Sequence, residues 1–550
     1  MKVLLALALG IAAFVPVAAN AGTLLTGVVR DTDGAAVVGA RIRALDAAGR
    51  ALGMDRAAAD GTFALDAVGE PTQLEISCAF CVRVRVDARS AIVIVRRYAV
   101  LRDAPLAPAD LAVLPYRRFS ELATLVPYAL ANGSEVADRG LDRGRGALVV
   151  DGVPLYRATD GASTSDLIVP MALANLIART PLDAPRYGTY AQGGVVDAST
   201  IGMPLVRIDG GDAFDASARV EAAAIHATVA SASDVGDRRG NAVLAADLPF
   251  AGGMLSARAI ALSDSVLSLR GALLGYTTAS RRARFSSRIA ARESPDSSLV
   301  DAVMSVDSRG ATPIELGIRA SRSTGILADG STGSQATQAI VLGAAAHATR
   351  VDTRVALAYE RESSALLFGA NTAAALTSSV AETIRFGDRF QLRGGVLGAF
   401  RAPTLLESES GFAGDRSMLV EAGATYTDNA RLRVGATAFN ERIAGASVRR
   451  LSGIGIDGTW QIAPALALRA WTLGNSATID TTYARRANVP IGTHRRVVWL
   501  TAGAALRVDL LARGGPLEGD VRVPFGAYAA TLGSSMQAGV RVTTLGVGTR

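Results

Sequence analysis

The segment Arg350–Glu360 (RVDTRVALAYE) decides the fold class of this chain. Its odd positions carry mainly Val, Leu and Tyr, whereas several of its even positions are charged. A period of two predicts a β-strand with one apolar and one polar face. Ile314–Ser321 (IELGIRAS) and Arg431–Ala436 (RLRVGA) alternate in the same way. Such strands suit a transmembrane β-barrel with a polar interior, and they also suit a soluble β-sandwich whose charged face meets water.

The length of the alternating series favours the barrel. Hydrophobic residues reach 49% and mean hydropathy is +0.28, yet the apolar residues after the N-terminus are dispersed position by position. No stretch there approaches the roughly 20 apolar residues that a membrane-spanning helix needs. We therefore expect residues 204–550 to form a large antiparallel transmembrane barrel of about 20 to 22 strands with short extracellular loops.

The N-terminus predicts export. Met1 and Lys2 precede an apolar run from Val3 to Val17, and Ala19–Ala21 (ANA) supplies a cleavage site of small residues. This order is typical of a secretory signal peptide, here residues 1–21. The mature chain should therefore function outside the cytoplasm.

Residues 22–100 read as a small immunoglobulin-like β-sandwich of short strands separated by Gly and Asp turns. Thr26–Asp31 and Val38–Ala44 predict two strands, and we expect Thr32–Gly34 to turn the first strand back. Ala59–Leu65 predicts a turn that opens a third strand. The Pro/Ala-rich residues 101–112 predict an extended linker.

The net charge of +7 does not point to nucleic acid. Lys2 is the only lysine, and the arginines are scattered among Asp and Glu without a basic block. We expect no nucleic-acid partner for an exported chain of this kind.

Cys78 and Cys81 are the only cysteines, and strand-like sequence flanks them. A redox-active pair needs a helix N-terminus, and zinc needs two further ligands, whereas the three histidines lie far away in the sequence. We expect a disulfide across a turn, with an unpaired state as the alternative. No metal site or cofactor is expected.

Four motifs follow one another between residues 113 and 203. The first motif is Leu114–Tyr128, which contains Pro127, and the second is Asp138-Arg139-Gly140. Gly146–Leu155 (GALVVDGVPL) contains the turn Asp151-Gly152. Pro185–Thr200 (PRYGTYAQGGVVDAST) contains Tyr187, Gly188, Gly193 and Gly194.

In this order the four motifs resemble the plug domain of TonB-dependent outer-membrane transporters. Residues 113–203 are therefore expected to form an α+β plug inside the barrel. Phe400–Glu407 (FRAPTLLE), with Arg401 and Pro403, resembles a barrel motif of the same family, and Asn488–His494 resembles a turn near its end. The strands of residues 22–100 resemble the carboxypeptidase regulatory-like domain, which carries no catalytic residues.

The resemblance also implies site residues. Arg139, Arg143 and Arg145 cluster in a Gly-rich loop; they either pair with carboxylates of the barrel wall or attract an anionic ligand to the plug apex. The segment Ala91-Ile92-Val93-Ile94-Val95 is the best candidate for a TonB box, and it reads equally well as the last strand of the sandwich.

The function that the resemblance implies is energised uptake of a scarce ligand by a monomer in the outer membrane, driven by a periplasmic TonB-type protein. Ferric siderophores rank first as cargo, then cobalamin and oligosaccharides. The alternative is a non-transporting receptor, adhesin or signalling protein of the same architecture. We expect no catalytic residues, because the chain lacks the G-x-S-x-G and H-E-x-x-H motifs in their required contexts.

Overall fold

The computed structural model describes residues 23–31, 37, 40–57, 62–77, 84–90, 92–95, 119, 129–132 and 135–138. It further describes residues 146–479, with gaps of one to four residues, and 495–512, 521–532, 535–542 and 546–547. The signal peptide, the linker and the segments Asp138–Gly140 and Asn488–His494 therefore lie wholly or partly outside the described residues. Within the described residues, no helix is both long and apolar enough to cross a bilayer.

The N-terminal strands form two small sheets that face each other across one core. The first sheet has the order β4-β1-β7, and the second has the order β3-β2-β5-β6. Buried side chains such as Val29, Ile42, Leu65 and Ile76 fill the space between them. The strands are β1 (Thr23–Asp31), β2 (Arg41–Leu45), β3 (Ala51–Arg56), β4 (Thr62–Ala67), β5 (Gln73–Ser77), β6 (Val84–Asp87) and β7 (Ile92–Val95).

Two details of this sandwich go beyond the sequence-based expectation. Thr32–Gly34 lies outside the described residues, but the Val37 N–H donates to the Val29 carbonyl oxygen at 3.0 Å, so the chain has come back beside β1 by Val37. β1 then pairs with β4 and β7, while β2 belongs to the opposite sheet. β3 was not predicted, since Ala51–Arg56 (ALGMDR) lacks a clear alternation of apolar and polar residues.

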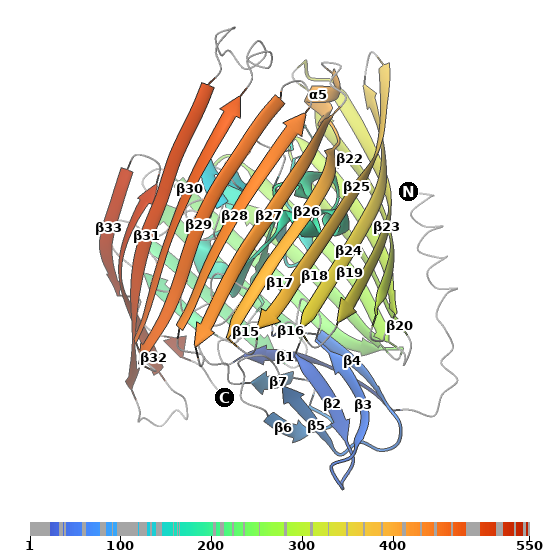
Figure 1. Ribbon diagram of the computed structural model, residues 1–550, viewed down its shortest axis with the longest axis vertical. Coiled ribbons are helices and arrows are strands. Elements are labelled where there is room, and N and C mark those ends of the chain that lie inside the picture. Colours follow the sequence, from blue (N-terminus) through green and yellow to red (C-terminus); the bar gives the residue numbers. More distant parts are fainter. Residues whose placement is uncertain are drawn as a thin grey trace.

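A four-stranded sheet, with the order β11-β10-β13-β12, lies inside the ring of long strands in Figure 1. β10 and β13 run parallel, and their neighbours run antiparallel to them. Short helical turns connect the strands. The elements are β8 (Ala129–Asn132), β9 (Glu135–Asp138), β10 (Ala147–Val150), β11 (Val153–Pro154), η1 (Ser165–Leu167), η2 (Pro170–Ala172), β12 (Asn175–Arg179), η3 (Pro181–Asp183), α4 (Ala184–Tyr187), η4 (Thr189–Ala191) and β13 (Val195–Ser199).

The long strands form a 21-stranded sheet in which successive strands pair. β33 and β34 pair with different parts of the same edge of β32, so together they occupy one strand position. The 21 described strands therefore make a sheet that is 20 strand positions wide. β14 and β34, at the two edges, lie next to each other. With an even number of strand positions, the first and last strands run in opposite directions and can close the barrel as an antiparallel pair, as in bacterial barrels.

The barrel strands are bounded as follows: β14 (Leu205–Asp209), β15 (Phe214–Ala222), β16 (Ile225–Asp234), β17 (Asp237–Phe250), β18 (Gly253–Ser263), β19 (Ser268–Ala279), β20 (Ala283–Ser294), β21 (Ser297–Ser308), β22 (Ile314–Ile326), β23 (Thr332–His347), β24 (Val351–Leu366), β25 (Gly369–Phe386), β26 (Phe390–Arg401), β27 (Asp415–Asp428), β28 (Leu432–Ala444), β29 (Val448–Ala463), β30 (Leu466–Ile479), β31 (Arg495–Ala512), β32 (Val521–Leu532), β33 (Ser535–Val542) and β34 (Gly546–Val547). One helix, α5 (Leu405–Glu409), lies between β26 and β27 at the upper end in Figure 1.

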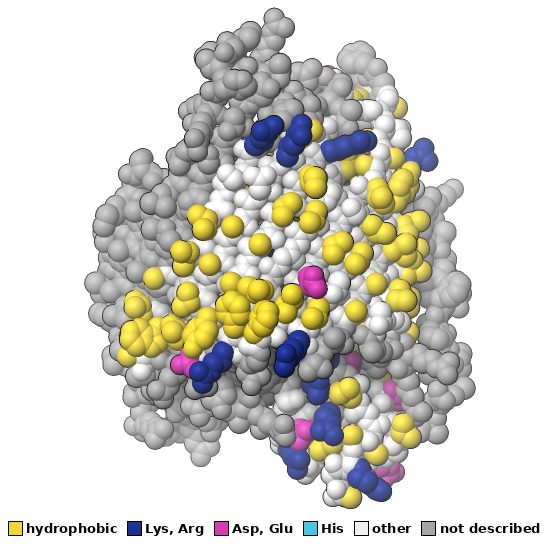
Figure 2. Space-filling view, in the orientation of Figure 1, with side chains coloured by type: hydrophobic (Ala, Val, Ile, Leu, Met, Phe, Trp, Pro, Cys, Tyr) yellow, Lys and Arg dark blue, Asp and Glu magenta, His cyan; other side chains and the backbone are white. Residues whose placement is uncertain are grey.

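The side-chain polarity of these strands is inverted relative to a water-soluble protein. On β24 the outward side chains Leu357 and Tyr359 are 37% and 51% exposed, whereas Glu360 and Glu362 are buried. β22 repeats this pattern, with Ile314, Leu316 and Ile318 facing outward. Figure 2 shows the resulting apolar side chains over the outer face. The alternation predicted from Arg350–Glu360 is confirmed, and its apolar face suits lipid.

Aromatic side chains gather at the lower end of this outer face, nearest the sandwich. Phe386 and Phe390 contact each other with ring centroids 5.9 Å apart. Phe250 and Tyr276 form a second pair, 6.5 Å apart and edge to face. Rings at this level suit the boundary between lipid tails and headgroups.

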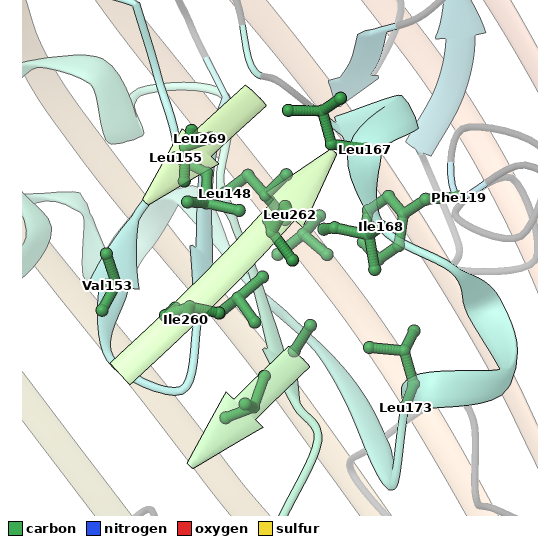
Figure 3. Close-up of a cluster of buried hydrophobic side chains, with 14 of the residues drawn as sticks. Phe119, Leu148, Val153, Leu155, Leu167, Ile168, Leu173, Ile260, Leu262 and Leu269 are labelled. Carbon is green, nitrogen blue, oxygen red and sulfur yellow. The ribbon is translucent and has the colours of Figure 1, made fainter. Parts of the chain in front are cut away.

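The four-stranded sheet and its turns pack against opposite walls of the barrel. One core joins Leu148, Val153 and Leu155 to Ile260, Leu262 and Leu269 of β18 and β19, and Figure 3 shows these side chains converging. A second core joins other residues of the same domain to β26–β29: Val149, Leu182 and Val195 meet Leu397, Leu419 and Phe439. The inner domain thus bridges the lumen, as expected of a plug.

The sandwich lies below the lower end of the barrel in Figure 1. β4 approaches β19, and the guanidinium of Arg284 donates to Oγ1 of Thr62 at 3.3 Å. Arg30 on β1 is buried and lies near His226 of β16. The N-terminal sandwich therefore contacts the barrel rim as well as its own core.

A charge placed on the outer face tests its contact with lipid. Leu376 is 61% exposed near the middle of β25, and Met54 is 58% exposed on the sandwich. We expect Leu376→Arg to lower the free energy of unfolding in lipid vesicles by about 2 to 4 kcal/mol, because the guanidinium would enter hydrocarbon. Met54→Arg, facing water, should change it by less than about 0.5 kcal/mol. Equal tolerance of both substitutions would contradict a lipid-facing outer surface.

Candidate functional site

The Asp151-Gly152 turn joins β10 to β11, and its aspartate side chain is hydrogen-bonded to the residues at the end of β13. Both residues have positive φ, 49° and 86°, as a tight two-residue turn requires. The Asp151 carboxylate accepts hydrogen bonds from the backbone N–H and Oγ1 of Thr200, at 3.0 and 2.7 Å, and from Oγ of Ser199 at 3.0 Å. A Cβ on Gly152 would come within 2.8 Å of Leu273 on β19. The turn is thus a structural contact between plug and wall.

The Tyr187-Gly188 motif ends α4 against a charged part of the wall. Arg319 of β22 donates to the Tyr187 carbonyl oxygen, and its Nε donates to Asp301 of β21 at 2.9 Å. Gly188 caps the helix with φ 92°, and a Cβ there would overlap the Arg319 guanidinium. The motif therefore needs glycine for two reasons: its backbone conformation and the space that Arg319 occupies.

The Tyr187 side chain packs within the plug. Burial raises the pKa of its phenol to about 12, so the phenol stays neutral. The Arg179 guanidinium lies 5.8 Å from the centre of its ring and bonds Asp197 at 3.1 Å. The Tyr187 ring thus packs beneath the ion pair between Arg179 and Asp197.

Gly193 and Gly194 precede β13. Gly194 has φ 107°, its N–H donates to Ala191 at 2.9 Å, and its carbonyl oxygen accepts from Ala147 at 3.1 Å. This turn sets the register in which β13 joins β10 in parallel.

The barrel motif anchors the connection that carries α5. Arg401 binds both carboxylate oxygens of Glu407 at 2.7 Å and reaches Asp415 at 2.9 Å. Thr404 and Glu407 cap the start of α5 reciprocally, because the Thr404 N–H donates to Glu407 and the Glu407 N–H donates to Thr404. The carbonyl oxygen of Pro403 accepts from Gln335 of β23 at 2.7 Å.

A polar chain links plug, wall and α5. The Tyr156 and Tyr190 rings lie 4.7 Å apart, and the Tyr190 hydroxyl donates to Gln335 at 3.4 Å. Gln335 also donates to Glu362 of β24. Arg292 of β20 donates to the Tyr156 carbonyl oxygen and, at 3.0 Å, to Ser297. The plug thus reaches the connection that carries α5 through Gln335, and also directly, because the Leu406 N–H donates to the Thr159 carbonyl oxygen at 3.0 Å.

Further ion pairs clamp the lower part of the plug. Arg186 bonds Glu315 of β22 at 2.6 Å, and Asp183 lies 3.8 Å from Arg354 of β24. Sequence reasoning did not single out these wall residues, nor Arg292, Arg319 or Gln335. Their only signal was a polar side chain on the inward face of an alternating strand, which does not reveal its partner in the plug.

Several predicted site residues lie outside the described residues. These are Arg139, Arg143 and Arg145 of the plug apex, Cys78 and Cys81, and Ala91. Ile92–Val95 form β7, which pairs in parallel with β1. The candidate TonB box thus coincides with the last strand of the sandwich. Within the described part of the chain, no group of three or more His, Cys, Asp or Glu side chains could hold a metal ion.

The FrpB iron transporter of Neisseria meningitidis matches with a TM-score of 0.60 and 12% identity, over 81% of this chain and 98% of its own. The copper transporter OprC matches with a TM-score of 0.61 and 11% identity, over 78% and 85%. The ferric citrate transporter FecA matches with a TM-score of 0.56 and 13% identity, over 80% and 96%. The chain has the fold of the TonB-dependent outer-membrane transporters.

This likeness is one of fold, because sequence identity to these structures is only 11 to 13%. No protein-family model matches the chain, and no curated protein matches it. The short motifs around Asp151, Tyr187 and Arg401 are nevertheless placed where plug, wall and upper connection meet.

Gly188→Ala tests the contact between the plug and Arg319. Gly188 has φ 92° and ψ −170°, a conformation that essentially only glycine adopts, so we expect a loss of unfolding free energy of about 3 kcal/mol or more and faster proteolysis of the plug. Gly330→Ala is the control for a positive φ alone: Gly330 has φ 83°, and nothing lies within 4 Å of its Cβ position. Equal losses of unfolding free energy in the two variants would show that the contact with Arg319 does not stabilise the protein.

Arg401→Gln tests the anchor of α5. It leaves the carboxylates of Glu407 and Asp415 without their shared cation, and Arg401 and Asp415 are both buried. We expect destabilisation of about 3 kcal/mol or more in denaturant titration. Arg50→Gln removes an exposed i,i+4 pair with Asp46 and should have no measurable effect. A similarly small effect of Arg401→Gln would contradict the anchoring role.

Proposed function

We propose that this protein imports a scarce small ligand across the outer membrane, driven by a TonB-type protein of the periplasm. The supporting observation is how the plug is held. Wall side chains donate to plug carbonyl oxygens, as Arg319 does to Tyr187 and Arg292 does to Tyr156. Such side-chain contacts can be broken and remade without unpairing a strand of the barrel.

The direction of transport follows from the arrangement of the parts. The sandwich and the candidate TonB box in β7 lie below the barrel, whereas α5 lies at its upper end. We assign the lower end to the periplasm and the upper end to the outside. A partner that pulls on the chain ahead of the plug would act from below. The ligand would then pass along the polar inner wall that the plug vacates.

The proposed cargo is a ferric chelate. Two of the similar structures are named for iron or ferric citrate and one for copper. We assign the first contact to Arg139, Arg143 and Arg145, because guanidinium groups suit the carboxylate and catecholate oxygens of anionic chelates. Cobalamin and oligosaccharides remain the next candidates, and the protein would act as a monomer without a cofactor.

The alternative is a non-transporting outer-membrane receptor. Its support is the shortness of some upper connections: only Pro295 and Asp296 lie between β20 and β21. Upper loops of this length offer little surface for enclosing a ligand. The transport experiment below separates the two functions.

Uptake of radiolabelled ferric citrate and ferric enterobactin is measured in cells with and without the chain, each with and without a proton uncoupler. We expect chain-dependent uptake of at least one chelate that the uncoupler abolishes. Uptake that survives the uncoupler would contradict energised transport. Binding at the cell surface without uptake would favour the receptor.

A reversible cross-link tests whether the plug must move. A Cβ on Gly271 of β19 would lie 3.1 Å from Val153 Cγ1 of the plug, within reach of a disulfide. In the double variant Val153→Cys, Gly271→Cys, we expect oxidation to stop uptake and a reductant to restore it, with surface binding unchanged. Wild type under the same reductant controls for Cys78 and Cys81. Undiminished uptake by the cross-linked protein would rule out a moving plug at this contact.

A further inference from the structure

A row of arginines faces outward just above the apolar band of the barrel. Figure 2 shows basic side chains along this upper edge. The exposed arginines at the upper ends of the described strands include Arg322 on β22, Arg361 on β24, Arg416 on β27, Arg442 on β28 and Arg450 on β29. The last three lie on neighbouring strands and form what we term the rim triad.

Strand register places the rim triad close together. Arg442 is directly opposite Arg450 in the β28–β29 ladder, and it is opposite Met418, two residues from Arg416, in the β27–β28 ladder. Directly opposed side chains have Cβ atoms about 4.5 to 5.5 Å apart, and diagonal neighbours lie about 7 to 8 Å apart. Two like charges directly opposite each other repel unless an anion lies between them.

The residues below the triad show that it faces the membrane boundary. Met418 follows Arg416 on the outer face of β27 and is 59% exposed, and Ile454 follows Arg450 on the outer face of β29 and is 58% exposed. Ile443 and Leu451, which alternate with the triad, are buried toward the lumen. The guanidinium groups therefore lie at the upper limit of the apolar surface, where lipid headgroups would be.

The triad has no counter-charge within the described part of the chain: no ion pair or hydrogen bond joins any of its side chains to a described residue. Arginines at the lower ends of neighbouring strands differ. Arg433 bonds Asp457 at 3.0 Å, and Arg389 lies 3.7 Å from Asp428. Arg433 and Asp457 alternate with outward side chains such as Val434 and Ile456, so this pair faces the lumen. Among the described residues, these strands thus pair an inward arginine with a carboxylate, whereas the outward triad has no such partner.

We propose that Arg416, Arg442 and Arg450 bind the phosphate groups of an anionic lipid in the leaflet around the upper rim. A phosphate oxygen can accept from two guanidinium groups at once, which would relieve the repulsion between Arg442 and Arg450. Apolar side chains directly below would contact the acyl chains of the same lipid. This proposal rests on the membrane location proposed above, and its test requires neither cargo nor TonB.

The test measures binding of phosphatidic acid and of phosphatidylcholine to the full mature protein in neutral detergent by native mass spectrometry. The variant Arg416→Gln, Arg442→Gln, Arg450→Gln should bind phosphatidic acid roughly a hundredfold more weakly than wild type, with phosphatidylcholine unaffected. The matched control Arg41→Gln, Arg56→Gln, Arg89→Gln removes three exposed charges from the sandwich and should bind as wild type does.

Three results would overturn the proposal. The first is unchanged phosphatidic acid binding by the rim variant. The second is an equal loss of phosphatidic acid binding in the sandwich variant, which would show that the effect depends only on net charge. The third is displacement of the lipid by equimolar inorganic phosphate, which would indicate a site for a free anion. If the triple variant does not fold, as judged by heat-dependent gel migration, Arg442→Gln alone is used, with a reduction of about fivefold expected.

Discussion

Backbone hydrogen bonding in an apolar surrounding is the constraint on which the rest of this structure depends. A strand that faces lipid cannot leave its N–H and C=O groups unpaired, so each strand from β15 to β32 pairs on both sides, and the edge strands β14 and β34 lie next to each other. Closing the sheet turns one face of every strand toward lipid and the other toward an enclosed space. The inversion of polarity on β24, with Leu357 outward and Glu360 inward, follows from that closure.

The polar inner wall in turn determines how the plug is held. Apolar contacts to β18–β19 and β26–β29 centre the plug, while the guanidinium of Arg319 and the side-chain amide of Asn241 donate to its carbonyl oxygens. Arginine suits this role, because it stays charged at every physiological pH. Its guanidinium can also donate to a wall carboxylate and to a plug carbonyl oxygen at the same time. Arg319, shared between Asp301 and Tyr187, shows this double use.

The sequence predicted the fold well and the site in part. The barrel followed from a period of two sustained over many segments, and Asp151-Gly152 and Tyr187-Gly188 stood in linear motifs whose residues are close in the sequence. Arg319, Gln335 and Arg292 could not be predicted as partners of the plug, because only the curvature of the closed sheet brings β20–β23 to it. In the sandwich, the strand partners of β1 could not be predicted, because β4 and β7 pair with it across 34 to 44 and 64 residues, as in Val28↔Thr62 and Val28↔Ile92.

The parallel pairing of β1 with β7 has a mechanical consequence. The chain enters β1 at Thr23 and leaves β7 at Val95 toward the plug, and the two strands are matched from Val28↔Ile92 to Asp31↔Val95. Tension between the N-terminus and the plug would act along both strands in opposite directions, so it would load their hydrogen bonds simultaneously in shear. Tension applied perpendicular to the two strands would instead break these hydrogen bonds one after another. The sandwich would therefore resist stretching along the chain much better than it resists peeling.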